Sequence, residues 1–394
     1  MATDAATARR RGPAPVARTA PAGLRRASER RAVLLALTAA ILLIIGLGAL
    51  LSASSVAAIR DGLDQYEIFR RQLVFVAVGI AAMIVTTRLP YRLHARMAPF
   101  LLLVAIAGLV ATLAFGSVRG GSRRWIELGP VTLQASEFAK FAVIAFLASV
   151  LARKEKHLAT FSHVFWPVAG SLGVVSLMLL LQPDLGTALL VGGAALAVLA
   201  ASAAPLRHVA GLGAAAIGGS ILLSIAEPYR RERVLSFLDP NPDILGDGLQ
   251  AFQSLVALGT GGLFGVGLGA SRARWSFLPN AHTDFIFAII GEETGLAGSL
   301  TIVALFIVFA VVGTMVAVRA ADQFGKLLAI GIVTWISLQA IVNIGGVVKA
   351  LPITGVPLPF VSAGGRSVIV TFAAVGVLIN IARNGLDPRP GSPA

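Results

Sequence analysis

The leading candidate for catalysis is a carboxylate that stands at the start of a long apolar stretch. Asp284 lies in the run His282-Thr283-Asp284-Phe285, and apolar residues dominate from there to Val318. A carboxylate at the mouth of a membrane-embedded helix is partly desolvated, which suits it to act as a general base. The alternative is that Thr283 or Asp284 only caps the helix, and the residue types alone favour the cap.

Two further carboxylates lie about two helical turns beyond Asp284. Glu292 and Glu293 follow Gly291 within the apolar stretch, where an ionised group needs a partner or a water-filled cavity. Helical geometry places Glu292 about 80° from Asp284 and Glu293 on the opposite face. Glu292 is therefore the glutamate that we expect to share a site with Asp284.

A second polar group begins with Arg123 and Arg124 beside Trp125 and continues to Glu137 and Lys140. The arginines suit the phosphate oxygens of an anionic headgroup, although simple anchoring at the membrane interface explains them equally well. Glu137 and Lys140 share one helix face and can pair. Lys140 is the only basic residue in the interior of an expected span, since Arg383 stands at the very end of the last one, so Lys140 is either functional or one half of a structural ion pair.

The third candidate is the segment from Lys349 to Ser367, which contains three prolines and three glycines and therefore cannot form a continuous helix. Irregular backbone this apolar must be buried in protein or line a cavity. We expect it to form a wall of a substrate groove, or a tight re-entrant connector. Lys349 and Arg366, which flank it, are candidates for binding an anionic substrate.

The composition indicates what kind of scaffold positions these residues. Of the 394 residues, 56% are hydrophobic and 13% are charged, about half of the charged fraction usual in a soluble domain. The absence of cysteine excludes disulfides, thiolate metal sites and cysteine nucleophiles, and the five scattered histidines do not suggest a zinc site. The net charge of +14 comes largely from short loops between apolar runs, which makes it a topology signal rather than a sign of nucleic-acid binding.

The apolar runs predict an all-α polytopic membrane protein with about ten transmembrane helices and one long non-cytoplasmic loop. The eighth run is too long for a single straight crossing, so we expect a break or kink within residues 291–295. The ten runs cover residues 33–52, 72–87, 98–115, 135–152, 164–181, 185–203, 208–226, 284–318, 327–348 and 367–383.

Most of the lysines and arginines fall on the side of the membrane that holds both termini, which predicts cytoplasmic termini and places Asp284 on the outer side. Residues 1–31 are expected to be a disordered basic cytoplasmic tail, residues 32–384 the transmembrane domain, and residues 385–394 a second cytoplasmic tail. Within the outer loop 227–283, the apolar, glycine-rich segment 248–269 is too short and broken to span and suggests an interfacial or re-entrant helix.

Six motifs in this order resemble the SEDS family, also known as the FtsW/RodA/SpoVE family, over about residues 35–384. The run from Phe287 to Glu293 is more similar to the division-type members than to the elongation-type members. Arg366 departs from the family pattern, which usually has serine there. The motifs are Gly121-Ser122-Arg123-Arg124-Trp125, Ser136-Glu137-Phe138-Ala139-Lys140, Gln182-Pro183-Asp184-Leu185-Gly186-Thr187, His282-Thr283-Asp284-Phe285-Ile286-Phe287-Ala288, Gly291-Glu292-Glu293 and Leu351-Pro352 through Gly365.

The resemblance implies a peptidoglycan glycosyltransferase that joins lipid II units into β-1,4 glycan strands during cell division and releases undecaprenyl diphosphate. It also implies that Asp284 is the essential acid, which reverses the preference for a cap. The residues expected to bind substrate or diphosphate are Arg123, Arg124, Glu137, Lys140, His282, Glu292, Lys349 and Arg366.

The expected partners are lipid II, a class B penicillin-binding protein with transpeptidase activity, and other divisome proteins of the plasma membrane, with the septum as the site of action and no nucleic acid. A divalent cation, Mg²⁺ or Mn²⁺, is compatible with diphosphate release, but no cage of carboxylates demands one. Two alternatives remain: a lipid II flippase, which needs a site near the membrane midplane, and a non-catalytic scaffold that recruits the transpeptidase.

Overall fold

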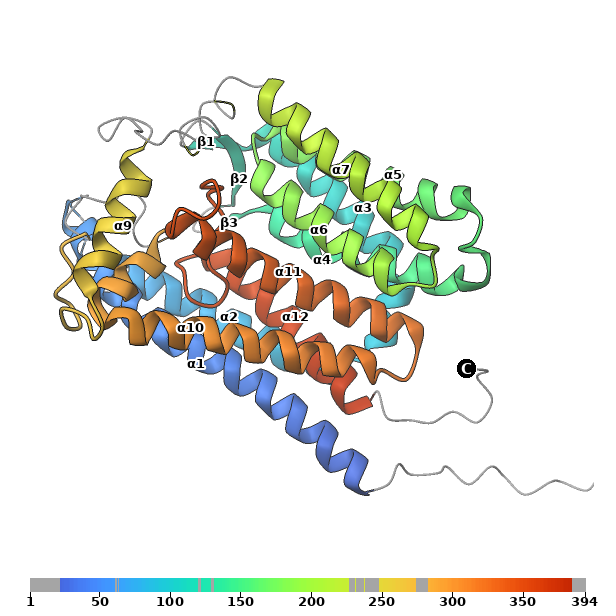
Figure 1. Ribbon diagram of the computed structural model, residues 1–394, viewed down its shortest axis with the longest axis horizontal. Helices are drawn as coiled ribbons and strands as arrows, with labels where there is room; N and C mark the ends of the chain where they lie inside the picture. The colour runs from blue at the N-terminus through green and yellow to red at the C-terminus, as the bar shows by residue number, and fades with distance from the viewer. Residues whose placement is uncertain are drawn as a thin grey trace, which may run out of the picture.

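The protein is a bundle of long helices capped at one end by a small sheet and a short helix (Figure 1). This computed structural model describes residues 22–60, 62, 64–119, 122–128, 131–226, 231, 237, 248–273 and 283–384. The long helices are α1 (Ala22–Arg60), α2 (Glu67–Arg88), α3 (Tyr91–Phe115), α4 (Ala135–Arg153), α5 (Phe161–Leu181), α6 (Leu185–Ala201), α7 (Leu206–Ala226), α10 (Ile286–Val318), α11 (Gln323–Val347) and α12 (Gly365–Asn384).

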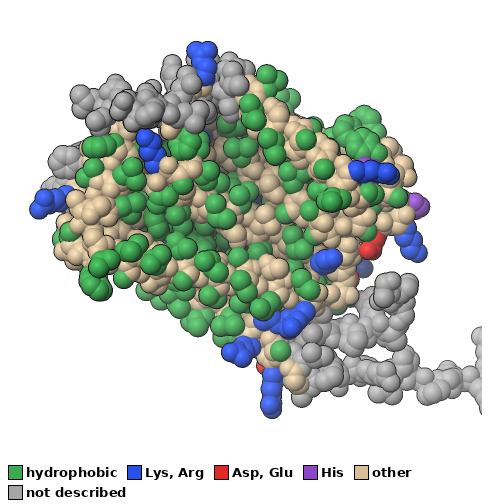
Figure 2. Space-filling view, in the orientation of Figure 1, with side chains coloured by type: hydrophobic (Ala, Val, Ile, Leu, Met, Phe, Trp, Pro, Cys, Tyr) green, Lys and Arg blue, Asp and Glu red, His purple; other side chains and the backbone are tan. Residues whose placement is uncertain are grey.

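These ten helices coincide with the ten apolar runs of the sequence, which confirms the expected polytopic fold. Within the described ranges, eight of them are long and apolar enough to cross a membrane, while α6 and the apolar part of α7 are shorter. Hydrophobic side chains cover the middle of the face drawn in Figure 2, whereas lysines and arginines lie toward the ends of the bundle. A surface of this kind is stable only against lipid, so the protein is a multi-pass membrane protein.

The start of α1 and the end of α12 lie at the same end of the bundle (Figure 1). There the Ser28 hydroxyl donates a hydrogen bond to the carbonyl of Ala382, and the Arg31 guanidinium donates to the carbonyl of Met315 near the end of α10. Helix α1 begins at Ala22, so the expectation of a disordered tail over residues 1–31 is wrong from residue 22 onward. Residues 1–21 and 385–394 lie outside the described residues.

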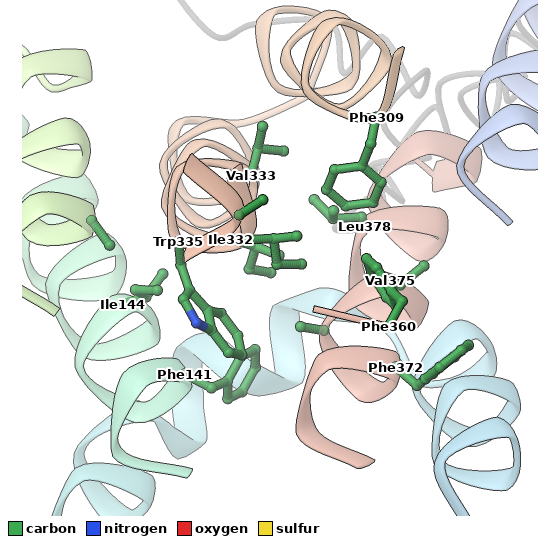
Figure 3. Packing of buried hydrophobic residues seen from close by; sticks show 14 of the residues in the cluster. Phe141, Ile144, Phe309, Ile332, Val333, Trp335, Phe360, Phe372, Val375 and Leu378 are labelled. Atoms are coloured by element: carbon green, nitrogen blue, oxygen red, sulfur yellow. The ribbon is translucent and has the colours of Figure 1, made fainter. Parts of the chain in front are cut away.

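The interior of the bundle is organised around α11, which contacts α4, α6, α10 and α12. Trp335 of α11 is fully buried and belongs, with Phe141 of α4, to the hydrophobic core (Figure 3). On the other side of the core, Phe360 packs between Phe309 of α10 and Phe372 of α12, with ring centroids 5.8 and 5.5 Å away. Aromatic pairs at these separations hold the irregular segment that contains Phe360 against two helices.

Helix α10 contains the expected kink, at Gly295, whose φ of 70° and ψ of −164° are open only to glycine. The kink frees backbone groups, and the turn after the short helix α9 (Leu249–Gly261) binds them. The amides of Leu296 and Ala297 donate to the carbonyls of Gly262 and Leu263 at 2.9 and 3.2 Å. This turn also donates in return, to the carbonyls of Glu292 and Glu293 at 3.0 and 3.1 Å.

Residues 261–267 and the kink thus form a reciprocal set of backbone hydrogen bonds, which we call the kink clasp. The clasp needs close backbone approach, because a Cβ at Gly265 would lie 2.1 Å from the carbonyl oxygen of Glu293. The short apolar helix expected within residues 248–269 is confirmed as α9, which packs on α10.

A three-stranded antiparallel sheet links α3 to α4 at the opposite end from the described ends of the chain. Its strands are β1 (Ser117–Arg119), β2 (Ser122–Leu128) and β3 (Val131–Leu133), in the order β1-β2-β3. The sequence pattern did not predict these strands, because they are short and lie among glycines within what reads as a loop. They place Arg123 and Arg124 next to the helix ends of α3 and α5.

The kink clasp yields a first prediction. Gly295→Ala should lower the free energy of unfolding by roughly 2–6 kcal/mol, because the new Cβ meets forbidden backbone angles as well as overpacking. That Cβ would lie 2.4 Å from the amide nitrogen of Gly265. Unfolding in detergent measures the effect. The matched control is Gly192→Ala in α6, where the added Cβ would have no neighbouring atom within 4 Å outside its own stretch of helix. This variant should be at least as stable as the wild type. Equal stability of both variants would contradict the clasp.

Candidate active site

Asp284 lies one residue before the N-cap of α10, at the same end of the bundle as the sheet. The N-cap position itself is occupied by Phe285. Asp284 is half-buried, whereas Phe285 and Ile286 after it are buried. The carboxylate therefore stands at the boundary between the protein interior and the surface.

Asp284 lines a shallow pocket at the surface, whose enclosed space is about 10 Å³, roughly that of one water molecule. Three segments form it: the start of α10, the last turns of α11, and the irregular segment after α11. Four residues of this irregular segment line the pocket, and its role as the wall of a substrate groove stays a prediction. The lining residues are Asp284, Phe285, Val342, Asn343, Gly346, Val347, Ile353, Thr354, Gly355 and Val356.

Gly355 brings the backbone of the irregular segment close to the catalytic candidate. A Cβ at this position would lie 3.7 Å from Oδ2 of Asp284, so a side chain here would occupy space beside the carboxylate. The φ of Gly355 is +71°, a left-handed conformation that glycine adopts without strain. The sequence thus keeps the pocket wall free of side chains where it approaches Asp284.

The irregular segment depends on polar side chains of α11 for its hydrogen bonds. The Gln339 amide donates to the carbonyl of Pro357, and the Asn343 amide donates to the carbonyls of Val356 and Asp284, all at 2.8 Å. Trp335, Gln339 and Asn343 are spaced four residues apart and so form one stripe on α11, which we call the α11 polar stripe. The stripe joins Asp284 to the pocket wall.

The α11 polar stripe also explains the ion pair of α4. Lys140 Nζ lies 2.9 Å from both oxygens of Glu137 and 3.1 Å from Oε1 of Gln339. Its ammonium lies 5.0 Å from the Trp335 ring centroid, close enough for a cation–π contact. Lys140 is 1% exposed and Glu137 is 3% exposed, so the pair is enclosed between α4 and α11. Of the two interpretations from the sequence, this geometry favours the structural ion pair.

Arg124 fastens the turn between α5 and α6. Its guanidinium donates to the carbonyls of Gln182 and Pro183 and lies 3.5 Å from Asp184, which caps α6 through the amide of Thr187. The carbonyl and carboxylate oxygens of this turn therefore bind the N–H groups of Arg124 that we expected to bind phosphate. Arg123 is exposed and donates to the carbonyl of Leu113, so it is the more accessible of the two arginines.

The remaining cationic candidates lie in different surroundings. Arg366, in the first turn of α12, donates to the hydroxyl of Thr132 and so connects α12 to β3. Lys349 is half-buried and has a left-handed φ of 53°. His282 lies outside the described residues. The roles of these three residues in binding an anion stay predictions.

Glu292 does not face the Asp284 pocket, contrary to expectation. Its carboxylate accepts hydrogen bonds from the Ser271 hydroxyl and from the amides of Arg272 and Ala273, at 3.1 and 3.2 Å for the amides. The helical wheel placed Glu292 near Asp284, but Asp284 precedes the helix and Glu292 turns toward the segment after α9. Glu293 is also buried and accepts from the Ser52 hydroxyl of α1. Both glutamates therefore hold segments around the kink.

Gln339 and Asn343 are the site residues that the sequence analysis missed. The available signal was a pair of amide side chains one helical turn apart in an apolar run, because polar groups inside a span are costly without partners. In the described part of the chain, no group of three or more histidines and carboxylates is placed to hold a metal ion.

The buried ion pair gives a second prediction. Lys140→Met should destabilise the protein by roughly 3–5 kcal/mol, because it leaves Glu137 buried without a counterion. The double variant Glu137→Gln with Lys140→Met should recover a large part of that loss, since it buries no charge. Unfolding of both variants in detergent provides the comparison. A single Lys140→Met variant as stable as the wild type would contradict the structural role of the pair.

Comparison with known proteins identifies the family of this chain. A family model described as cell cycle protein, for FtsW, RodA and SpoVE, matches residues 32–386. Stage V sporulation protein E of Bacillus subtilis is 40% identical, over 89% of this chain and 96% of the relative. A probable peptidoglycan glycosyltransferase FtsW of Geobacter metallireducens is also 40% identical, over 90% of this chain and 95% of the relative.

Solved structures agree with these relatives. A structure described as the structural coordination of polymerization and crosslinking by a peptidoglycan synthase complex matches with a TM-score of 0.73 and 27% identity, covering 89% of this chain and 97% of that one. The crystal structure of the Thermus thermophilus rod shape determining protein RodA matches with a TM-score of 0.67 and 25% identity, covering 89% and 96%. The chain therefore belongs to the FtsW/RodA/SpoVE family of multi-pass membrane proteins, the SEDS family.

Proposed function

We propose that this protein is a peptidoglycan glycosyltransferase that polymerises lipid II during cell division, with Asp284 as its general base. The observation that carries the proposal is the position of Asp284 in a pocket at one end of a membrane-spanning bundle. Lipid II presents its sugars at the membrane surface, where such a pocket can reach them. Relatives about 40% identical over most of the chain bear the name probable peptidoglycan glycosyltransferase FtsW, which supports the same activity.

The proposed reaction is an in-line displacement at the anomeric carbon of the donor sugar. The 4-hydroxyl oxygen of the acceptor sugar attacks that carbon, and the bond from the carbon to the diphosphate oxygen breaks. An α-linked donor then gives a β-linked product. Asp284 accepts the hydroxyl proton as the new bond forms, and undecaprenyl diphosphate leaves with the bonding electron pair. The half-buried position of Asp284 suits this role, because its carboxylate is held by the protein and can still contact a substrate at the surface.

The leaving diphosphate requires positive charge nearby. Arg123 is exposed and lies on β2, so we assign it to the diphosphate first. Arg366 lies at the start of α12 beside the same sheet and is the second candidate. Arg124 and Lys140 act indirectly, since their charges already bind the α5–α6 turn and Glu137. A divalent cation at the diphosphate stays a prediction.

The proposed location is the plasma membrane at the division septum, with both termini in the cytoplasm and the Asp284 pocket on the outer side. The charge bias of the loops supports this orientation. The proposed partner is a class B penicillin-binding protein, which cross-links the glycan strands. A structural neighbour belongs to a peptidoglycan synthase complex that polymerises and crosslinks, and this supports a partner of that kind.

The third prediction concerns Asp284 directly. Asp284→Asn should reduce lipid II polymerisation by roughly 10²-fold or more, the usual scale for loss of a proton-transfer group. Stability and lipid II binding should be unchanged, because asparagine has the same shape and Asp284 does not occupy the N-cap position. The measurement is polymerisation of purified lipid II by purified protein, with and without its partner.

Asp322→Asn is the matched control for this variant. Asp322 is the N-cap of α11, accepting from the amide of Gly325 at 2.8 Å, and lies away from the pocket. Its other oxygen pairs with Arg92 at 2.9 Å and accepts from the Tyr91 hydroxyl at 2.8 Å, so loss of its charge should cost stability. This control should change stability more than it changes polymerisation per folded molecule. Wild-type polymerisation by Asp284→Asn would remove Asp284 from the mechanism, and continued growth of cells carrying that inactive variant would favour the scaffold alternative.

The fourth prediction tests the orientation. A reporter fused after Pro240, in the long loop, should be non-cytoplasmic, and one fused after Ala320 should be cytoplasmic. Ala320 follows α10 at the end where Arg31 contacts Met315, so it lies with the described ends of the chain. A cytoplasmic signal after Pro240 would reverse the orientation and place the pocket on the side that lacks the growing wall.

A further inference from the structure

Asn343 combines two properties that no other described pocket residue shares. Its side chain is only 5% exposed, and the oxygen Oδ1 of its amide has no hydrogen-bond partner among the described residues. Its amino group donates two hydrogen bonds, to the carbonyls of Asp284 and Val356. These two acceptors fix the orientation of the amide, because an oxygen in that place would face two carbonyl oxygens. The carbonyl oxygen Oδ1 is therefore the free acceptor.

No donor among the described residues lies within hydrogen-bond distance of Oδ1. A buried acceptor without a donor costs free energy, so its retention calls for a reason. Other buried acceptors in the described ranges share this property, for instance Ser54 and Gln182, but Asn343 alone among them lines the Asp284 pocket.

A second buried asparagine shows how the same residue behaves when its role is only structural. Asn380 of α12 is 2% exposed, donates to the carbonyl of Thr87 at 2.7 Å and accepts from the amide of Tyr91 at 3.0 Å. Both halves of its amide are satisfied. The contrast with Asn343 shows that this fold can satisfy a buried asparagine completely, and that at the pocket the acceptor is left over.

We propose that Asn343 is a substrate-binding residue: its Oδ1 accepts a hydrogen bond from a neutral N–H or O–H group of the sugar bound beside Asp284. The inference rests on the proposed function, because the sugar is the one whose hydroxyl Asp284 deprotonates. An uncharged acceptor suits a hydroxyl or an acetamido N–H and gives no advantage to a diphosphate, which carries no donor. Asn343 thus selects for the sugar, whereas cations bind the leaving group.

The two halves of the amide then act together. The amino group sets the position of the Asp284 backbone, and Oδ1 sets the position of the sugar relative to that same backbone. One rigid side chain thereby fixes the distance between the general base and the hydroxyl that it deprotonates, which is the kind of positioning that raises rates by orientation. Gly355, which has no side chain beside Asp284 Oδ2, leaves room for the sugar on the opposite wall.

The test uses the full-length protein in detergent with lipid II and compares Asn343→Ala, Asn343→Asp and Asn380→Ala. Asn343→Ala should raise the KM for lipid II roughly 3- to 10-fold per folded molecule, the scale of one neutral hydrogen bond. Asn343→Asp keeps the acceptor Oδ1 and should recover most of that affinity per folded molecule. Its second oxygen faces the carbonyls of Asp284 and Val356, so this variant, like Asn343→Ala, loses stability. Asn380→Ala, the control, should lose stability with an unchanged KM.

The outcomes separate the inference from the function on which it rests. If the wild type polymerises lipid II and Asn343→Ala keeps the wild-type KM, the inference alone is overturned. It is also overturned if Asn343→Asp is as impaired in KM as Asn343→Ala, since the amino group alone would then explain the effect. A wild type that does not polymerise lipid II, alone or with its partner, overturns the proposed function and the inference together.

If Asn343→Ala does not fold, a binding measurement on the wild-type protein tests the hydrogen bond to Oδ1 instead. Lipid II analogues, each with one hydroxyl or acetamido N–H methylated, are tested for binding to the wild type and to Asn343→Asp. One analogue should lose roughly 3- to 10-fold in affinity for the wild type, because the methyl group removes the donor. Equal affinity of every analogue would contradict a hydrogen bond to Oδ1.

Discussion

Backbone amides and carbonyls that lie outside a helix must find partners within the protein when the surroundings are lipid. The architecture of this protein follows from that requirement at two places. At the kink of α10, the turn after α9 supplies backbone partners on both sides of Gly295. After α11, the α11 polar stripe supplies Gln339 and Asn343 to the carbonyls of an irregular segment. The pocket lies beside the second of these places, between the start of α10, the end of α11 and that segment.

The helical scaffold and the irregular pocket wall could be predicted because their causes are local. Apolar runs of sufficient length specify spans, and the prolines and glycines of residues 351–365 forbid a helix and so require a buried path. Gly295 lay within the short glycine- and glutamate-containing run where the kink was expected. The start of α1 was misplaced because its arginine-rich first turns read as a solvated tail, although Ser28 and Arg31 bind the ends of α12 and α10.

Side-chain partners could not be predicted, because they depend on which helices pack together. Arg124 suits a phosphate oxygen and a carbonyl oxygen equally, and only the packing of β2 against the α5–α6 turn selects the carbonyls. Glu292 was assigned to the pocket by assuming that one helix runs from Asp284 onward. The helix begins after Asp284, so helical geometry does not fix the angle between Asp284 and Glu292. The carboxylate of Glu292 instead accepts hydrogen bonds from the segment after α9.

The ion pair of Glu137 and Lys140 has a consequence for how the protein enters the membrane. Because both charges belong to one helix and lie one turn apart, α4 carries its own counterion before any other helix is present. A lone lysine disfavours partition of a nascent span into the bilayer, by up to roughly 2.5–3.5 kcal/mol at the centre of the span, and Lys140 lies within the first half of α4. Because Glu137 neutralises the lysine within the same helix, α4 can insert into the membrane before α11 is synthesised. Gln339 and Trp335 of α11 then contact the Lys140 ammonium when the two helices pack. The ion pair thus allows α4, which is synthesised first, to enter the membrane before its partner helix α11 exists.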